Sequence, residues 1–360
     1  MSIIFYFLAF SFSLGQLGRV SLFNNQINFY LYEAFLAIFI LGLFFKYRFH
    51  PLIEFQKKYN PFFVFLGILL ISLFNGMANY PIFVNVVGLL YLLRLCLYGT
   101  YWAYLAYWIR KDLIAKIALK KAFWTIVILT VASTITQYFL YPDLRNLFYL
   151  GWDPHLYRTF GVFFDTAVAG TFFGMLFLYN GKPIIKITYL IFTILSFSRS
   201  IYLALGISFF YIFFINKDFK KFILYLLVGL TLIFIAPKPS GEGVNLFRTF
   251  SISSRLEDYK EGLNLFIKKP ILGYGYNRLR YVRQIPKSNA GGAFSSSYLT
   301  ILVSSGLMGF IGLISLLSLI WKNNISKRQI LVFVGIASLF DNVFLHPFVL
   351  FLLFTLLSDK

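Results

Sequence analysis

The stretch FVNVVGLLYLLRLCLYGTYWAYLAYWI, residues 83–109, decides the fold class of this chain. It is apolar almost throughout, and Arg94 is its single charged residue. A helix needs about 20 apolar residues to cross about 30 Å of hydrocarbon. The stretch therefore predicts a membrane-spanning helix.

The composition of the whole chain points the same way. Of its 360 residues, 59% are hydrophobic and 13% are charged, against about 45–50% and about 25% in soluble globular proteins. The single cysteine, Cys96, excludes a disulfide framework and a Cys-rich metal site. We expect an all-α integral membrane protein that uses no metal and no cofactor.

Further apolar stretches on both sides of residues 83–109 predict about twelve transmembrane helices, with ten to twelve as the range. The first has no basic leader and no cleavage site, so we expect a retained span. The last two are separated by Asp341, Asn342 and Pro347, which leaves a helical hairpin or a re-entrant pair open. The expected spans lie near residues 2–18, 30–45, 61–75, 83–109, 120–140, 163–180, 183–197, 201–215, 222–236, 297–320, 329–343 and 344–358.

The formal net charge of +20 is expected to set the orientation in the membrane rather than to bind nucleic acid. With the N-terminus inside, 18 of the 33 Lys and Arg fall in cytoplasmic segments. Short loops follow the positive-inside rule, so both termini are predicted to be cytoplasmic. The chain then divides into a membrane bundle of about nine spans (1–236), a large external loop (237–296) and the last two or three spans (297–360).

The long external segment contains a predicted amphipathic helix. Apolar side chains recur at helical spacing, and Ser254 with Glu257 matches a capping box, so the helix is expected to follow Ser254. Pro270 should end it, and Gly273 and Gly275 should allow a tight turn. The helix is expected to lie on the membrane surface or over the bundle. The apolar residues are Ile252, Leu256, Tyr259, Leu263 and Phe266.

Five Arg make up half of the basic residues of this external segment. Residues 237–293 hold ten basic and four acidic residues. The planar guanidinium of Arg suits phosphate oxygens, so an anion site is one interpretation and a basic surface that binds lipid headgroups is the other. Arg158 and Arg199 lie at external helix ends, where they could be interfacial anchors or could line the same anion site. The Arg residues of the segment are Arg248, Arg255, Arg278, Arg280 and Arg283.

Four ordered stretches resemble the superfamily of O-antigen ligases and O-antigen polymerases. They are FGVFFDTAVAGTFFG (160–174), LSFSRSIYLAL (195–205), SSRLEDYKEGLNLFIKKPILGYGY (253–276) and SSYLTILVSSGLMGF (296–310). Arg158 and Gly174 also match the Arg-x15-Gly pattern of external loops in O-antigen polymerases. The resemblance covers about residues 155–320.

The resemblance implies a GT-C-like, metal-independent glycosyltransferase on the outer face of the bacterial cytoplasmic membrane. Such an enzyme takes a saccharide from undecaprenyl diphosphate and attaches it to an acceptor glycan. Arg199 and Arg255 match the two Arg thought to engage the donor diphosphate. The other residues expected to bind substrate are Arg158, Arg248, Arg278, Arg280, Tyr276 and Ser295.

One departure from the ligase pattern favours a polymerase of lipopolysaccharide or another cell-envelope glycan. Ligases carry a His before the span that begins near Tyr298, and this chain has Ser295, Ser296 and Ser297 there. Membrane lipid is an expected partner, and a chain-length regulator is a further candidate. The general base could be Asp165, Glu257, Asp258, Asp341 or His346.

Two alternatives belong to other classes of protein. A transporter or flippase would place charges in mid-span, as Arg94 is placed. A non-catalytic scaffold of a glycan-assembly complex is the other. The sequence has no phosphate-binding loop for nucleotides, so the donor is expected to be lipid-linked.

Overall fold

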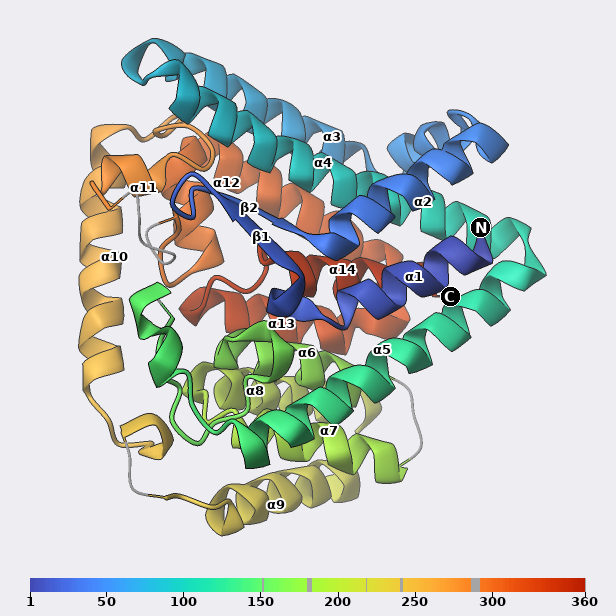
Figure 1. Cartoon of the computed structure of the whole chain (residues 1–360), viewed down its shortest axis with the longest axis vertical. Helices are drawn as coiled ribbons and strands as arrows, with labels where there is room; N and C mark the ends of the chain where they lie inside the picture. Colours follow the sequence, from blue (N-terminus) through green and yellow to red (C-terminus); the bar gives the residue numbers. More distant parts are fainter. Residues whose placement is uncertain (151, 180–182, 218, 240–241, 286–291, 360) are drawn as a thin grey trace.

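The structure is a computed structural model that describes residues 1–150, 152–179, 183–217, 219–239, 242–285 and 292–359. It is 78% helical, and Figure 1 shows the helices gathered in one bundle. A single antiparallel hairpin, β1 (Arg19–Leu22) with β2 (Ile27–Tyr30), is the sheet found in the described part of the chain. The expected all-α membrane architecture is confirmed at this level.

The described part of the chain forms fourteen α-helices. Their bounds are α1 Ser2–Phe12, α2 Leu31–Tyr47, α3 His50–Asn75, α4 Ile82–Lys111, α5 Leu113–Leu140, α6 Thr166–Leu178, α7 Pro183–Leu195, α8 Arg199–Asn216, α9 Phe219–Ile235, α10 Phe250–Lys268, α11 Leu279–Val282, α12 Ser297–Asn323, α13 Arg328–Phe340 and α14 Pro347–Ser358.

Three of the described helices are long and apolar enough to cross a membrane: α3, α4 and α12. They contain the spans expected near 61–75, 83–109 and 297–320. Shorter apolar helices, among them α6, α8 and α14, are also present. The count of twelve spans stays a prediction.

The first expected span, 2–18, is wrong in its extent. The helix α1 ends at Phe12, and Gly15 takes a left-handed φ of +54° before the hairpin begins. A Cβ at Gly15 would lie 2.3 Å from the Val162 carbonyl oxygen. Close packing of two backbones therefore ends the helix early and turns the chain into β1.

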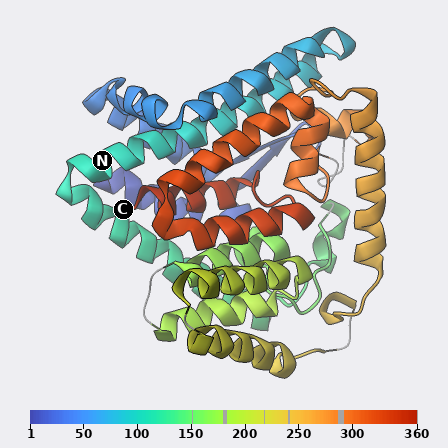
Figure 2. The ribbon, with the colours of Figure 1, turned by 180° about the vertical axis from the view of Figure 1, so that it is seen from behind.

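The two termini lie at one end of the bundle, and α10 lies across the opposite end, as Figures 1 and 2 show from two sides. The junction of α4 and α5 is at the end that carries the termini. Its Arg110 and Lys111 belong to the basic residues that we assign to the cytoplasmic side. Which end faces the cytoplasm stays a prediction.

The core is aromatic and is centred on α14. Phe348 through Ser358 are all buried. Phe354 stacks on Trp102 of α4 with ring centroids 4.9 Å apart, and Phe351 stacks on Tyr101 at 5.1 Å. A helix of 12 residues spans only about 18 Å, which is less than the ~30 Å of a hydrocarbon core.

The helix α12 is broken at Gly306, which has φ +66°. The segment that follows α10 supplies the missing partners, because Leu307 N donates to Pro270 O at 2.7 Å and Gly275 N donates to Ser304 O at 2.8 Å. A Cβ at Gly306 would lie 2.2 Å from the Ile271 carbonyl oxygen. Backbone contact at this break fixes the external segment to the bundle.

Candidate functional site

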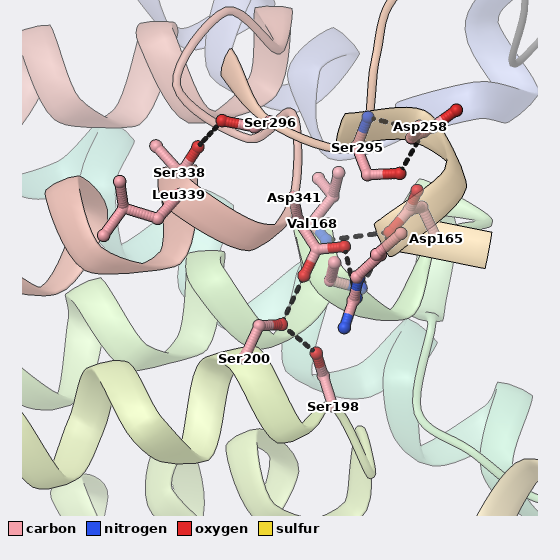
Figure 3. Close-up of polar contacts among 12 residues, drawn as sticks. Asp165, Val168, Ser198, Ser200, Asp258, Ser295, Ser296, Ser338, Leu339 and Asp341 are labelled. Atoms are coloured by element: carbon pink, nitrogen blue, oxygen red, sulfur yellow. Dashed lines mark hydrogen bonds and ion pairs between the residues drawn. The ribbon is translucent and has the colours of Figure 1, made fainter. Parts of the chain in front are cut away.

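The short helices α13 and α14 meet in a turn that presents Asp341. Asp341 is the C-cap of α13, as its position near a helix end predicted. Its Oδ1 accepts a hydrogen bond from Arg255 Nη2 at 2.8 Å, and its Oδ2 accepts one from the Ser200 hydroxyl. Ser198 Oγ lies 2.8 Å from Ser200 Oγ, and Figure 3 shows these hydroxyls below the carboxylate. Three distant segments therefore converge on one acidic group.

Arg255 reaches this carboxylate because α10 turns a polar face toward the bundle. Asp258 and Tyr259 share that face: the Tyr259 hydroxyl donates to the Leu339 carbonyl, and Asp258 Oδ2 accepts from Ser295 N at 3.0 Å. Leu256 is 57% exposed and Leu263 is 48% exposed. Part of the expected apolar stripe thus faces outward, where it can contact lipid.

The expected capping box at Ser254 is wrong. The helix α10 begins at Phe250 with Thr249 as N-cap, so Ser254 lies inside the helix. The intervening residues continue the helix and remove the free N–H groups that a cap at Ser254 would serve. The predicted end is confirmed, because Lys269 leaves the helix directly before Pro270, and the predicted turn is confirmed by positive φ at Gly273 and Gly275.

Three further Arg lie around the start of α8. Arg199 Nη1 donates to Arg248 O at 2.8 Å, and Arg248 Nη2 donates to Phe197 O at 3.1 Å. Arg158 Nε donates to Ser196 O at 2.7 Å. Backbone carbonyls, rather than carboxylates, account for these contacts. Such contacts orient the guanidinium groups.

The electrostatics of these Arg indicate crowding of like charge. Burial, and then the charge of Arg248, lower the pKa of Arg158 to about 10. Burial, and then Arg199 and Arg255, lower the pKa of Arg248. Neighbouring cations disfavour one another's charged form. An anion bound here would relieve that repulsion.

Asp165 lies beside this Arg cluster and caps α6. Its Oδ1 accepts from Ala167 N at 2.7 Å and from Val168 N at 2.9 Å. The span expected at 163–180 would place it inside the helix, but it is the N-cap residue, with extended backbone. Its carboxylate also interacts electrostatically with Arg158 and Asp341.

The remaining residues of the expected site make other contacts. Arg278 is buried against Asn85 and stacks over Tyr80 at 4.9 Å. Arg280 Nη1 donates to Asn25 O of the hairpin at 3.1 Å. These side chains join the external segment to α4 and the hairpin.

Tyr276 and Glu257 are not brought to Asp341 either. Tyr276 packs against the main core and interacts electrostatically with Arg94 of α4. Glu257 is exposed on the outer face of α10. We therefore no longer place Glu257 in the catalytic group.

The Ser triplet that replaces the ligase His has structural contacts. Ser295 donates to Asp258, which also accepts from Arg283 Nη2 at 2.7 Å. Ser296 accepts from Leu299 N and donates to Ser338 O at 3.1 Å. The triplet thus ties the start of α12 to α10 and α13.

Ser297 completes the triplet and holds the turn after Asp341. Its hydroxyl donates to Asn342 Oδ1 at 3.0 Å and accepts from Phe344 N at 3.1 Å. Sequence reasoning missed this role, as it missed Ser198 and Ser200. Ser198 and Ser200 flank Arg199 in the SRS stretch, and this position was the sequence signal that could have identified them.

Arg94, which favoured a transporter, is held in an ion pair. Its Nη2 lies 2.8 Å from Glu33 Oε2, and Tyr98 donates to Glu33 Oε1 at 2.7 Å. Its guanidinium also lies 5.0 Å from the Tyr91 ring centroid. A charge paired in this way is accounted for by folding alone.

Fold and site together describe a helical membrane protein in which Arg side chains gather around one carboxylate. Residues 184–314 match a family model described as O-Antigen ligase. The match to this segment supports the O-antigen ligase and polymerase superfamily. No curated protein matches the chain. Within the described residues, no three His, Cys, Asp or Glu side chains come together as a metal site requires.

The matched range covers only part of the site. Arg199, Arg255 and Ser295 lie inside it. Arg158, Asp165 and Asp341 lie outside it and are brought to the site by the fold. The family supports a ligase-like or polymerase-like function in general, with lipid-linked glycans as the class of substrate.

Proposed function

We propose that this protein is a polymerase of a bacterial surface polysaccharide. It transfers a glycan from undecaprenyl diphosphate to a lipid-linked acceptor glycan. The reaction takes place at the outer face of the cytoplasmic membrane, with both termini in the cytoplasm. The proposed transfer uses no metal ion.

The observation that carries the proposal is the convergence of Arg158, Arg199, Arg248 and Arg255 near Asp341. Three of them interact electrostatically with one another, and Arg158 interacts with Arg248. A diphosphate offers several anionic oxygens, which paired guanidinium groups bind well.

The arrangement also fits the chemistry of the transfer. Negative charge grows on the diphosphate as the bond to the anomeric carbon breaks. Fixed cations near that oxygen stabilise the transition state more than the ground state. We propose that Arg255 and Arg199 bind the diphosphate of the donor substrate. Arg248 and Arg158 hold the second half of the diphosphate.

Asp341 has a different proposed role. It pairs with Arg255 at 2.8 Å and accepts from Ser200. A carboxylate in this place orients the guanidinium for the phosphate oxygens. Ser200 in turn orients the carboxylate.

The acceptor side supports a polymerase over a ligase. Ser295, Ser296 and Ser297 stand where ligases keep a His, and their hydroxyls are engaged by Asp258, Ser338 and Asn342. A hydroxyl in such contacts is a poor proton acceptor near neutral pH. The site therefore lacks the acceptor-assisting group of a ligase at that position.

The direct test uses the purified protein with an undecaprenyl-diphosphate-linked oligosaccharide. Longer lipid-linked products and released undecaprenyl diphosphate are expected. Arg255→Ala should abolish both. Consumption of donor without longer products would contradict a polymerase.

A second experiment separates polymerase from ligase. The unmodified chain is expressed in a ligase-deficient strain, and transfer of glycan to lipid A core is measured. No transfer is expected. Complementation would overturn the polymerase assignment in favour of a ligase. Unchanged chain growth in a strain that lacks this protein would overturn the enzyme assignment.

A further inference from the structure

His346 closes the turn between α13 and α14. The backbone N–H of His346 donates to Val343 O at 3.1 Å, and its backbone carbonyl accepts from Leu350 N at 2.9 Å. The imidazole packs against Phe348 with ring centroids 5.4 Å apart. Backbone and packing contacts thus fix the ring in the turn that also presents Asp341.

One nitrogen of the imidazole ring lacks a hydrogen-bond partner among the described residues. His346 Nδ1 is buried, and none of the described residues hydrogen-bonds to it. Buried polar atoms are nearly always paired, so an exception calls for a specific reason. In the tautomer with its proton on Nε2, Nδ1 accepts a hydrogen bond. A hydroxyl group of a ligand would satisfy it.

The surroundings of the ring place it between two polar regions. Asp165 interacts with it electrostatically from the start of α6, and Asp165 in turn interacts with Asp341. Arg94 and Arg19 interact with it from α4 and the hairpin. His346 therefore lies in the turn that also carries Asp341 and is acted on by the charges of Asp165, Arg94 and Arg19.

We infer that His346 binds the attacking hydroxyl of the acceptor glycan through Nδ1 and receives its proton. The inference rests on the proposed function. The start of α12 has Ser where ligases have the His that assists the acceptor. His346, in the turn after α13, takes that role here. Asp165 is a positioning residue in this arrangement, because its carboxylate favours the imidazolium that forms.

The step balances as a single displacement. The acceptor oxygen forms a bond to the anomeric carbon of the donor, and the bond from that carbon to the diphosphate oxygen breaks. Its electron pair leaves with undecaprenyl diphosphate, toward the Arg cluster. The hydroxyl proton passes to His346 Nδ1 and is later lost to water.

The test compares His346→Asn with His346→Ala in the full-length protein. The Asn carboxamide oxygen can lie near the position of Nδ1, so it can accept a hydrogen bond but cannot take up the proton. Elongation kinetics are measured with a lipid-linked donor and a lipid-linked acceptor. Donor binding is measured separately with undecaprenyl diphosphate. His50→Asn is the matched control, since His50 is an exposed residue at the start of α3.

For His346→Asn we expect kcat to fall by about 10²-fold or more with little change in the KM for acceptor. For His346→Ala the KM for acceptor should also rise about tenfold, because a hydrogen bond is lost. Binding of undecaprenyl diphosphate should remain unchanged in both. The elongation rate of wild type should depend on pH through one basic group, and this dependence should disappear in His346→Asn.

Normal elongation by either variant would overturn this inference and leave the proposed function standing. Restoration of full kcat by Asn would reduce His346 to a binding residue and would likewise overturn it. A wild-type protein that neither elongates nor releases undecaprenyl diphosphate would contradict the proposed function itself. If His346→Ala fails to fold, His346→Asn carries the test alone.

Discussion

Arg255 and Asp341 lie 86 positions apart in the sequence, and their side chains meet at 2.8 Å. The contact joins α10, which crosses one end of the bundle, to the turn between two short helices inside it. Arg255 is 26% exposed and Asp341 is 18% exposed. An ion pair at this border can both hold α10 in place and present a guanidinium to an anionic ligand.

Replacing Arg255 with Ala or Lys should abolish glycan polymerisation while the protein still inserts into the membrane. Lys keeps the charge but loses the planar fork that engages two oxygens. We expect a rate loss on the order of 10²- to 10³-fold, measured as released undecaprenyl diphosphate. Arg145→Lys, in an exposed pair with Asp143, is the control. A fully active Lys variant would reduce the site to simple charge attraction.

Asp341→Asn should slow the transfer by about tenfold or more and lower the stability by about 1–2 kcal/mol. The amide keeps an oxygen for Ser200 but removes the charge that balances Arg255. Product formation and thermal unfolding in detergent check the two effects. Asp143→Asn, in a loop pair with exposed Arg145, should change neither. Equal rates of product formation and equal unfolding temperatures for Asp341→Asn and Asp143→Asn would show that the Asp341 charge is unimportant.

Gly306→Ala should destabilise the protein by about 1–3 kcal/mol or more. Its φ of +66° suits glycine, and a Cβ would lie 2.2 Å from a backbone oxygen of Ile271. Thermal unfolding provides the measurement. Gly206→Ala is the control, because a Cβ there meets nothing within 4 Å. A Gly306→Ala protein as stable as the control would contradict the strained break in α12.

Stability should fall as the pH drops from about 6.5 to about 4, in part through His155. Burial, and then the neighbouring Arg158, lower the pKa of His155 from 6.5 to about 4. In that window the unfolded chain binds a proton that the folded chain does not, so unfolding is favoured as pH falls. His155→Gln should flatten the pH dependence of the unfolding temperature. The exposed His50→Gln should leave it as in wild type.

A cysteine introduced at Lys268 should react with a membrane-impermeant reagent from outside, and one at Lys217 should not. The test requires Cys96→Ser, which removes the native thiol. Residues 237–293 are external in our topology, and residues 216–221 are cytoplasmic. Labelling at Lys217 from outside would overturn the assignment of the site to the outer face.

The long helices could be predicted because their signal is local. The stretch 83–109 is apolar enough to define α4, and α4 is observed as Ile82–Lys111. The hairpin of β1 and β2 escaped prediction, although its strands pair locally, and its turn is held by a distant segment through Arg280 and Asn25 O. The early end of α1 has the same cause, because Gly15 is fixed by its approach to Val162.

The site divides in a similar way. The sequence pointed to Arg199, Arg255, Asp165 and Asp341 by residue type and position. It could not tell that Arg278 would turn to Asn85 instead. Side chains spaced closely along α10 and α11 diverge because the turn at Gly273 and Gly275 sends them to different faces of the bundle.

The sequence by itself determined the class of this protein, because hydrophobic length and the type of charge are properties of consecutive residues. It also determined that five Arg would lie in the external segment. Only the tertiary structure decided which Arg meets which carboxylate. Ser200 and Arg255 reach Asp341 across 141 and 86 positions, and such contacts depend on how the helices pack in three dimensions.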